Sequence, residues 1–297
     1  MHTAPFHRLI RSWGFALALA LSSVPPVQAQ DAATLTARHA ALREALKNNA
    51  FQRPLVLEST ESADALRGDI YARIDQPMAV VGPALQDAGH WCDILILHLN
   101  VKQCRSLGAA GGARLALVIG SKHDQPLADA YRFEFSHQVV AAQPDYLQVQ
   151  MKADAGPMGT RLYRITLEVV ALDAGSSFLH LSYAYSYGMA ARMAMQLYLS
   201  TIGRNKLGFS IVGRQPDGRP IYIGGTRGVV ERNTMRYYLA IQAYLGALSL
   251  PPAQQFEQRL AEWYAGAERY PLQLHEIERG EYLAMKRAQV KRPTAVD

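Results

Sequence analysis

The feature of this sequence that most constrains its fold is an alternation of apolar and polar residues that runs from about residue 94 to residue 187. A period of two over such a length is typical of strands with one buried and one solvated face. The connections are short enough for hairpins, which favours an antiparallel sheet. Turn residues divide the alternation into six strands, since they interrupt it at 108–112, 122–126, 143–145, 156–159 and 173–176.

The last of these strands has the most distinct faces. Tyr183, Tyr185 and Tyr187 share the face predicted to be buried, whereas His180 lies on the face predicted to be solvated. A seventh strand is predicted at 67–75, where small and branched apolar residues alternate with charged ones. The fold class predicted is therefore α+β, with a curved seven-stranded antiparallel sheet.

Periodic spacing of three and four residues predicts helices on both sides of this sheet region. An amphipathic helix is expected to cap the fold from outside at the beginning of the chain, and the longest helix is expected after the sheet. The predicted segments are helices at 31–49, 78–85, 189–201, 226–248, 253–268 and 271–291, and a hairpin made by 208–212 and 220–223.

The first 29 residues have the pattern of a secretory signal peptide. Arg8 and Arg11 precede an apolar run at 14–21, and the small-residue site Val27-Gln28-Ala29 follows Pro25-Pro26. The run is far shorter than the ~20 residues that cross a bilayer. No cysteine lies near the site, which disfavours a lipoprotein. We expect cleavage after Ala29 and a soluble protein in the periplasm.

Composition and charge exclude several classes of function. With 49% hydrophobic and 19% charged residues among 297, the chain is expected to fold. The 31 basic and 25 acidic side chains give a formal charge of +6, but long runs of like charge are absent from the sequence. We therefore expect no nucleic-acid partner, and we expect a monomer that makes at most transient contact with a membrane or a protein.

The two cysteines, Cys92 and Cys104, are expected in an oxidising compartment, where thiols can pair. If 92–104 were one strand, its ends would lie ~40 Å apart at ~3.3 Å per residue, and no bridge would form. A disulfide therefore requires the chain to reverse between them. The alternatives are two buried thiols, or a metal site with His90 and His98, whose spacing fits no usual zinc site. We expect the disulfide, and neither a metal nor a cofactor.

The order of a strand, a short helix, six antiparallel strands and a long helix resembles the helix-grip fold. The segment 68–77, with Val80-Val81 and then Trp91, resembles the opening of the START-like superfamily of lipid-transfer proteins, polyketide cyclases and coenzyme Q-binding proteins. The segment 156–163 is similar to the hairpin in which Gly-x-Thr begins a core strand of that superfamily. The resemblance covers about residues 65–248.

Two features depart from the family pattern. The helix at 189–201 and the hairpin after it separate the last strand from the long helix, so either 189–201 or 226–248 is expected to pack in the curve of the sheet. The helices beyond Pro252 match no part of the family. We therefore divide the chain into a signal peptide at 1–29, a START-like domain with its capping helix at 30–250, and a helical extension at 251–297.

The resemblance implies a cavity between the sheet and a late helix, lined by apolar side chains from both. Methionine adapts to irregular apolar shapes, and tyrosine adds a hydroxyl that can orient a polar group. The same side chains would equally suit an ordinary filled core. The resemblance implies that the residues against a ligand are Trp91, Tyr183, Tyr185, Tyr187, Met189, Met193, Tyr237 and Ile241.

Arg232 and Arg236 lie four residues apart on the long helix, and therefore share a face. Two guanidinium groups on one face can bind a carboxylate or phosphate head group, although solvated surface charge is the commoner use of such a pair. We predict a non-catalytic periplasmic binding or carrier protein for a lipid or other hydrophobic small molecule.

Motifs for catalysis are absent from the sequence. It contains no Gly-x-Ser-x-Gly, no His-Glu-x-x-His, no phosphate-binding glycine loop and no dinucleotide-binding glycine motif. An enzyme of the polyketide cyclase or dehydratase type would need an acid and a base in the cavity, and the candidates are Asp93, His98 and His180. This enzyme and an interaction module that uses the C-terminal helices are the alternatives to the carrier.

Overall fold

A computed structural model describes residues 31–108, 112–201 and 203–292 of the chain. The predicted signal peptide at 1–29 and its cleavage site at Ala29 lie outside these residues, so both stay predictions. Within the described residues, no helix is both long enough and apolar enough to span a bilayer.

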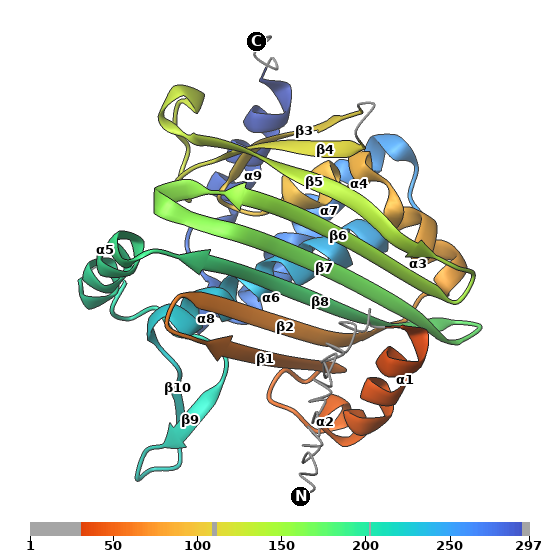
Figure 1. Cartoon of the computed structure of the whole chain (residues 1–297), viewed down its shortest axis with the longest axis horizontal. Helices are drawn as coiled ribbons and strands as arrows, with labels where there is room; N and C mark the ends of the chain where they lie inside the picture. The colour runs from red at the N-terminus through yellow and green to blue at the C-terminus, as the bar shows by residue number, and fades with distance from the viewer. Residues whose placement is uncertain (1–30, 109–111, 202, 293–297) are drawn as a thin grey trace, which may run out of the picture. The chain divides into compact units, whose positions relative to one another are not determined.

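A single antiparallel sheet of eight strands forms the centre of the described fold (Figure 1). The strand order is β1-β2-β8-β7-β6-β5-β4-β3, so every neighbouring pair except β2 and β8 is joined by a direct connection. The strands are β1 (Leu55–Glu61), β2 (Ala65–Ile74), β3 (Val101–Leu107), β4 (Ala113–Ile119), β5 (Tyr131–Ala142), β6 (Tyr146–Ala155), β7 (Thr160–Asp173) and β8 (Ser176–Tyr187).

The sheet confirms the predicted fold class, but the sequence analysis predicted seven strands and the sheet has eight. The strand missed is β1, which pairs with β2 from Leu55 against Ala72 to Glu61 against Leu66. Its sequence does not alternate, because the apolar residues are confined to its first half and the rest is polar. As an edge strand it has a neighbour on one side only, and its exposed end needs no second apolar face.

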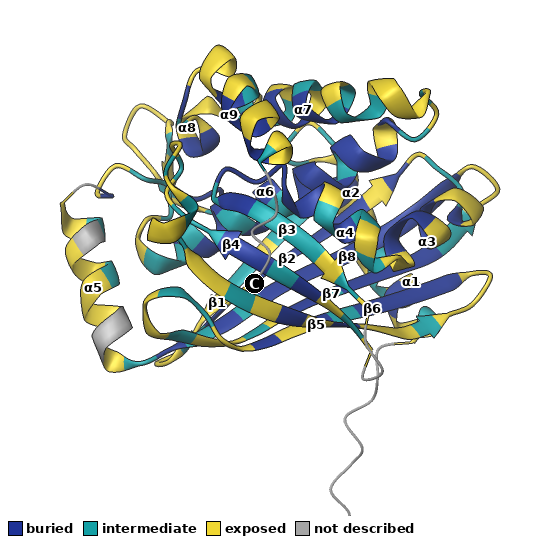
Figure 2. Ribbon diagram, turned by 90° about the horizontal axis from the view of Figure 1, so that it is seen from above, coloured by how far each residue is buried: buried dark blue, intermediate teal, exposed yellow. Residues whose placement is uncertain are grey.

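Helices lie on both faces of the sheet (Figure 2). On the inner face, α6 packs against β1, β2 and β8, while α7 and α9 form a further layer beyond it. On the outer face, α1 contacts β7 and β8. The helices are α1 (Ala32–Ala41), α2 (Arg43–Lys47), α3 (Met78–Gln86), α4 (Ala88–Leu95), α5 (Met189–Ser200), α6 (Gly225–Gly246), α7 (Pro252–Glu268), α8 (Pro271–Leu274) and α9 (Arg279–Lys291).

The long helix α6 is the one that packs in the curve of the sheet, as in a helix-grip fold. Gly68 of β2 allows its close approach, since a Cβ at that position would collide with Oγ1 of Thr234. Fourteen of the residues of α6 are buried, including Ile241 and Tyr244. The other candidate for this role, α5, projects from the end of the sheet where β8 ends (Figure 1). A short hairpin, β9 (Ile211–Arg214) with β10 (Pro220–Tyr222), separates α5 from α6.

Candidate functional site

A pocket of about 250 Å³ lies between the inner face of the sheet and α6. Aromatic rings from β5, β7, β8 and α6 form its apolar wall, and cationic side chains form much of the rest. The lining residues are His98, Asn100, Ile119, Lys122, Phe133, Phe135, Pro157, Met158, Tyr163, Tyr183, Met195, Val229, Arg232, Asn233, Arg236 and Tyr237.

The apolar wall is a continuous set of ring contacts. Tyr183 lies 5.2 Å from the ring of Tyr237 and 6.2 Å from that of Tyr163, and Tyr163 in turn contacts Phe133 and Phe135. Burial raises the pKa of Tyr163, and it raises the pKa of Tyr183 and Tyr237 further. All three phenols are therefore neutral at physiological pH, so this wall presents rings and hydroxyl groups but no charge.

The charged part of the pocket is cationic. Lys122, Arg232 and Arg236 line it, and among the residues that the structure describes no acidic side chain does. Arg232 and Arg236 are both buried, at 3% and 2% exposure, so the reading of this pair as solvated surface charge was wrong. Nη1 of Arg232 donates to the backbone oxygen of Leu207 at 3.1 Å, which holds the guanidinium against the segment before the hairpin.

Glu276, between α8 and α9, neutralises part of this charge from behind the pocket. Its carboxylate accepts from Lys122 at 2.5 Å, from Lys206 at 2.6 Å and from Arg236 at 2.9 Å. Burial opposes its ionisation, but the charges of Arg236 and Lys122 outweigh burial and lower the pKa of Glu276 to about 2. Burial lowers the pKa of Lys122 to about 8. One carboxylate thus faces three cations, which leaves the pocket electropositive.

His98 is the polar group that faces the apolar and the cationic parts of the pocket together. It is 3% exposed and stacks on Tyr237 with ring centres 4.9 Å apart. The backbone N–H of Asn100 donates to Nδ1 at 3.1 Å, so the proton of the neutral ring is on Nε2. Nε2 is buried and has no hydrogen-bond partner among the described residues. Burial, followed by the charge of Arg236, holds the pKa of His98 well below its usual value, so the ring is neutral.

The segment that carries His98 is fixed at both ends. Cys92 of α4 and Cys104 of β3 form a disulfide with Cα atoms 5.2 Å apart, because the chain reverses between them as the pairing requires. This loop is also bound from outside by α9. The hydroxyl of Tyr282 donates to the oxygen of Leu97, and Nζ of Lys286 donates to the oxygens of His98 and Val101 at 2.7 and 2.8 Å.

Four of the predicted ligand residues line the pocket, namely Tyr183, Arg232, Arg236 and Tyr237. Tyr185, Tyr187 and Ile241 are buried in the same core but outside the pocket lining. Trp91 is likewise a core residue, since its indole N–H donates to the backbone oxygen of Leu85 and its ring is 1% exposed.

The prediction for Met189 and Met193 was wrong. Both side chains are largely exposed, at 81% and 64%. The reason is that α6, rather than α5, fills the curve of the sheet, so these two side chains of α5 are left largely in solvent. Met195 is the residue of α5 that reaches the pocket.

Several of the pocket residues that the prediction omitted lie on β5 and in two loops, which the sequence pattern did not connect to the pocket. Phe133 and Phe135 share one face of β5, and this alternation was a usable signal that they face the core. Lys122 and Asn100 lie in loops, where periodicity carries no information about direction. Only the pairing of β3 with β4 brings these two loops together, and the side-chain amide of Asn100 donates to the oxygen of Gly120.

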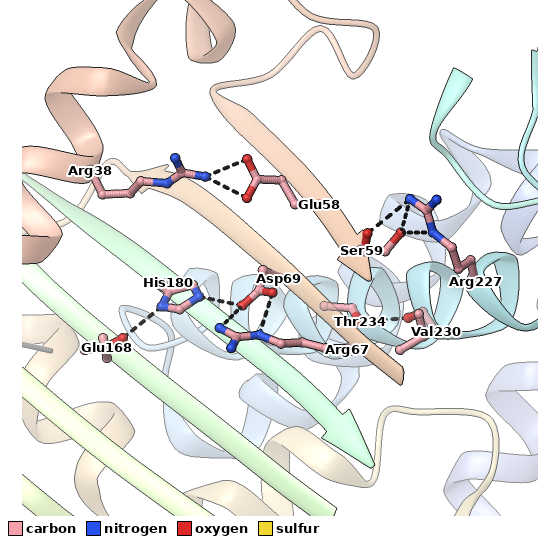
Figure 3. A network of polar contacts seen from close by, with 10 residues as sticks. All are labelled: Arg38, Glu58, Ser59, Arg67, Asp69, Glu168, His180, Arg227, Val230 and Thr234. Carbon is pink, nitrogen blue, oxygen red and sulfur yellow. Dashed lines mark hydrogen bonds and ion pairs between the residues drawn. The ribbon is translucent and has the colours of Figure 1, made fainter. Parts of the chain in front are cut away.

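His180 and Asp93 lie away from the pocket. His180 is on the outer face, as its strand position predicts, but it is 1% exposed because α1 and Tyr71 cover it. The prediction that this part of the outer face is solvated was therefore wrong. Its ring bonds to Asp69 and Glu168, and Figure 3 shows this chain of contacts continuing to Arg67. Asp93 accepts from Arg259 at 2.8 Å, and its carboxylate is about half exposed.

No protein-family profile matches the chain, and no curated protein is similar to it in sequence at a significant level. Solved structures to which it is similar include norcoclaurine synthase from Thalictrum flavum, at 13% identity over 50% of this chain and 82% of that one, with a TM-score of 0.33. A START superfamily protein from Mycobacterium smegmatis is 12% identical over 48% of this chain and 90% of that one, with a TM-score of 0.33.

A conserved protein from Geobacillus kaustophilus is 10% identical over 61% of this chain and 95% of its own, with a TM-score of 0.35. Similarity at this level says nothing of a ligand or an activity. The description of this chain as a helix-grip protein rests on its own topology, in which an antiparallel sheet curves over the late helix α6.

Proposed function

We propose that this protein binds a small amphipathic acid in the pocket between the sheet and α6, and carries it without changing it chemically. The observation that carries the proposal is the composition of the pocket, which joins a wall of neutral aromatic rings to three cationic side chains and a buried imidazole N–H. Such a surface suits a ligand with an apolar or aromatic body and a carboxylate or similar anionic end.

The size of the pocket favours a compact ligand. A cavity of about 150 Å³ holds one benzene molecule, and pockets for drug-sized ligands begin at about 300 Å³. The pocket of about 250 Å³ therefore has room for one or two rings with a short polar group, or for a short acyl chain. A lipid with two long chains would exceed it, so the small hydrophobic molecule is favoured among the ligands that the sequence suggested.

His98 is the residue that we expect to select the anionic end. Its Nε2–H is buried and without a partner among the described residues, and leaving such a donor unpaired costs about 1–3 kcal/mol. An acceptor atom of the ligand would satisfy it, with the charges of Lys122, Arg232 and Arg236 close by. A ligand that accepts this hydrogen bond would therefore gain affinity over one that cannot accept it.

Titration with a fluorescent acid and its matched amide tests this proposal. We expect 2-naphthoate to bind with at least about tenfold higher affinity than 2-naphthamide, since a hydrogen bond to a charged group contributes about 1.5–3 kcal/mol. His98→Leu should reduce naphthoate binding by a similar factor. His137→Leu is the matched control. His137, on β5, is buried like His98 but does not line the pocket. Equal affinity for acid and amide would contradict the proposal.

The natural ligand can be identified from protein that is purified from cells with the ligand still bound. Denaturation, solvent extraction and mass spectrometry should release a small acid that is retained by the wild type and lost from His98→Leu. Mass spectrometry of the intact chain would also show whether it has been cut after Ala29, which the periplasmic carrier role requires. An intact first residue in protein from the natural host would contradict export by cleavage.

Catalysis in the same pocket is the second candidate, because a buried imidazole, His98, lines it, but the hydrogen bonding of the ring argues against this role. Its Nδ1 lone pair is already used by Asn100, and its Nε2 holds a proton, so the ring can donate a hydrogen bond but is poorly placed to accept a proton. None of the pocket residues is a carboxylate that could complete an acid and base pair. A candidate acid whose mass changes with time in the presence of the wild type, but not of His98→Leu, would favour an enzyme over the carrier.

A further inference from the structure

An exposed apolar surface lies at the end of the sheet, next to the pocket. It consists of Met189, Met193 and Leu197 of α5, with Met158 from the turn between β6 and β7 and Leu162 from the start of β7, and we call it the α5 face. These side chains are between 59% and 81% exposed. The three residues of α5 follow one another at intervals of four, so they form one stripe along the helix. A stripe of this kind on a folded protein marks a binding surface.

Two of these side chains belong to residues with a strained backbone conformation. Met158 and Leu162 both have φ of 53°, in the left-handed region that residues with a Cβ rarely adopt. Such a conformation costs on the order of 1–3 kcal/mol per residue and occurs most often where function requires it. Here it accompanies two large apolar side chains on the surface of the molecule, and the 3-10 turn that contains Met158 also contacts α5.

The charge along α5 and the segment that follows it is positive. Residues 174–216 contain Arg192, Arg204, Lys206 and Arg214 but no Asp or Glu. Arg192, Arg204 and Arg214 are exposed. The turn between β1 and β2 brings Asp64 close to the start of α5, where the backbone oxygen of Asp64 accepts from Tyr187. The helix and the segment that follows it nevertheless present only basic charge to a partner.

From this combination we infer that the α5 face docks on an anionic lipid surface. An amphipathic helix with an apolar stripe and basic flanks lies in the interface of a bilayer, where its apolar side chains enter the headgroup region and its cations contact anionic lipids. A second copy of the chain fits less well, because a two-fold contact would bring the same arginines together. The flexible side chain of methionine suits a fluid partner.

The α5 face lies next to the pocket, so docking on a bilayer would bring the pocket close to molecules dissolved in the bilayer. Met195 of α5 and Met158 both line the pocket, so the pocket adjoins the surface that would meet the lipid. Under the proposed function, an amphipathic acid dissolved in the bilayer would enter the protein without crossing water. The docking itself does not depend on that function, because the stripe of α5 on which it rests, Met189, Met193 and Leu197, is not part of the pocket lining.

Co-sedimentation of the recovered protein with vesicles tests the inference. We expect binding to phosphatidylcholine vesicles that contain phosphatidylglycerol, weaker binding to phosphatidylcholine alone, and a fall in binding as salt rises. The double variant Met193→Ser and Leu197→Ser should bind at least about tenfold more weakly, because two apolar side chains no longer enter the interface. Arg204→Gln should lose part of the preference for the anionic lipid.

The matched control is Leu272→Ser with Val290→Ser, which removes two other exposed apolar side chains, from α8 and α9. It should bind vesicles as the wild type does. Absence of vesicle binding at low salt, or an equal loss in the control, would overturn the inference. So would a dimer in sedimentation velocity that only the α5 variant abolishes, since the face would then belong to a second copy. Naphthoate binding, measured without vesicles, reports on the pocket separately.

Discussion

His180 of β8 and Asp69 of β2 form a buried pair on the outer face of the sheet, with Nε2 and Oδ1 2.8 Å apart. Glu168 bonds to the other ring nitrogen at 2.8 Å, and Tyr71 stacks on the imidazole with ring centres 4.4 Å apart. Burial opposes a charge on His180, but the hydrogen bonds to Asp69 and Glu168 outweigh it and raise the pKa of the ring. The folded state thus favours the imidazolium form of His180 between the two carboxylates beneath α1.

The stability of the protein should therefore depend on pH through His180. Because the folded state holds the proton more tightly than the unfolded chain, this contribution is complete below about pH 6.5 and is lost as pH rises through the raised pKa. His180→Asn should lower the free energy of unfolding at pH 6 by about 3 kcal/mol and remove this pH dependence. Urea unfolding across pH 5–9 measures both effects, with exposed His123→Asn as the control. An unchanged slope in His180→Asn would contradict the expectation.

Glu276 provides a second pH-dependent contribution, of the opposite sign. Its pKa falls from an ordinary 4.5 to about 2, so its contribution is complete above about pH 4.5 and is lost as pH falls through 2. Glu276→Gln should cost about 3 kcal/mol in the free energy of unfolding at neutral pH, because it leaves Lys122 and Arg236 without their shared carboxylate. The exposed Glu262→Gln is the control. A cost below 1 kcal/mol would show that the three cations find other partners.

Lys286→Met tests whether α9 holds the loop that carries His98. The substitution roughly keeps the length of the side chain but removes two hydrogen bonds, to the oxygens of His98 and Val101, and each such bond contributes about 0.5–1.5 kcal/mol. We expect a less stable protein that also binds 2-naphthoate more weakly. Lys291→Met, at the exposed end of the same helix, should change neither property. If Lys286→Met lowers stability but binds 2-naphthoate with unchanged affinity, α9 does not influence ligand binding in the pocket.

The disulfide should stabilise the fold by about 2–3 kcal/mol, the range expected for a cross-link that closes a loop of this length. Replacement of Cys92 and Cys104 by alanine should lower the thermal unfolding temperature, and treatment of the wild type with a reductant should lower it similarly. The double variant should not respond to the reductant. If reduction leaves the wild type unchanged, the bridge contributes nothing to stability.

The fold was largely predictable because the sheet alternates along most of its length. Each predicted turn between residues 94 and 187 separates two of the observed strands, and the long helix follows at the predicted place. The strand β1 was not predictable in the same way, since its register is set by hydrogen bonds to β2 and its sequence has no period. Local pattern is informative where one face is buried along its whole length.

The site was predictable only in part. The direction in which a loop side chain points, and ion pairs between residues far apart in the sequence, do not follow from local sequence pattern. Tyr183 and Tyr237 follow from periodicity, and they line the pocket. The burial of Arg236 depends on Glu276, which lies 40 residues away and pairs with it through the packing of the C-terminal helices. His98 could not be distinguished from Asp93 by sequence, since only the bridged loop turns one inward and leaves the other at the surface.

The hydrogen bonds from Lys286 and Tyr282 to the loop of His98 have a consequence for biosynthesis. Translation proceeds from the first residue to the last, and the chain reaches the sheet, α6 and the loop itself well before it reaches α9. A chain still on the ribosome that has not yet reached α9 therefore lacks the bonds that hold the backbone of this loop. Under the proposed function, the pocket therefore reaches its final form only after α9 has been synthesised and has packed, so a chain that lacks α9 would bind the ligand poorly.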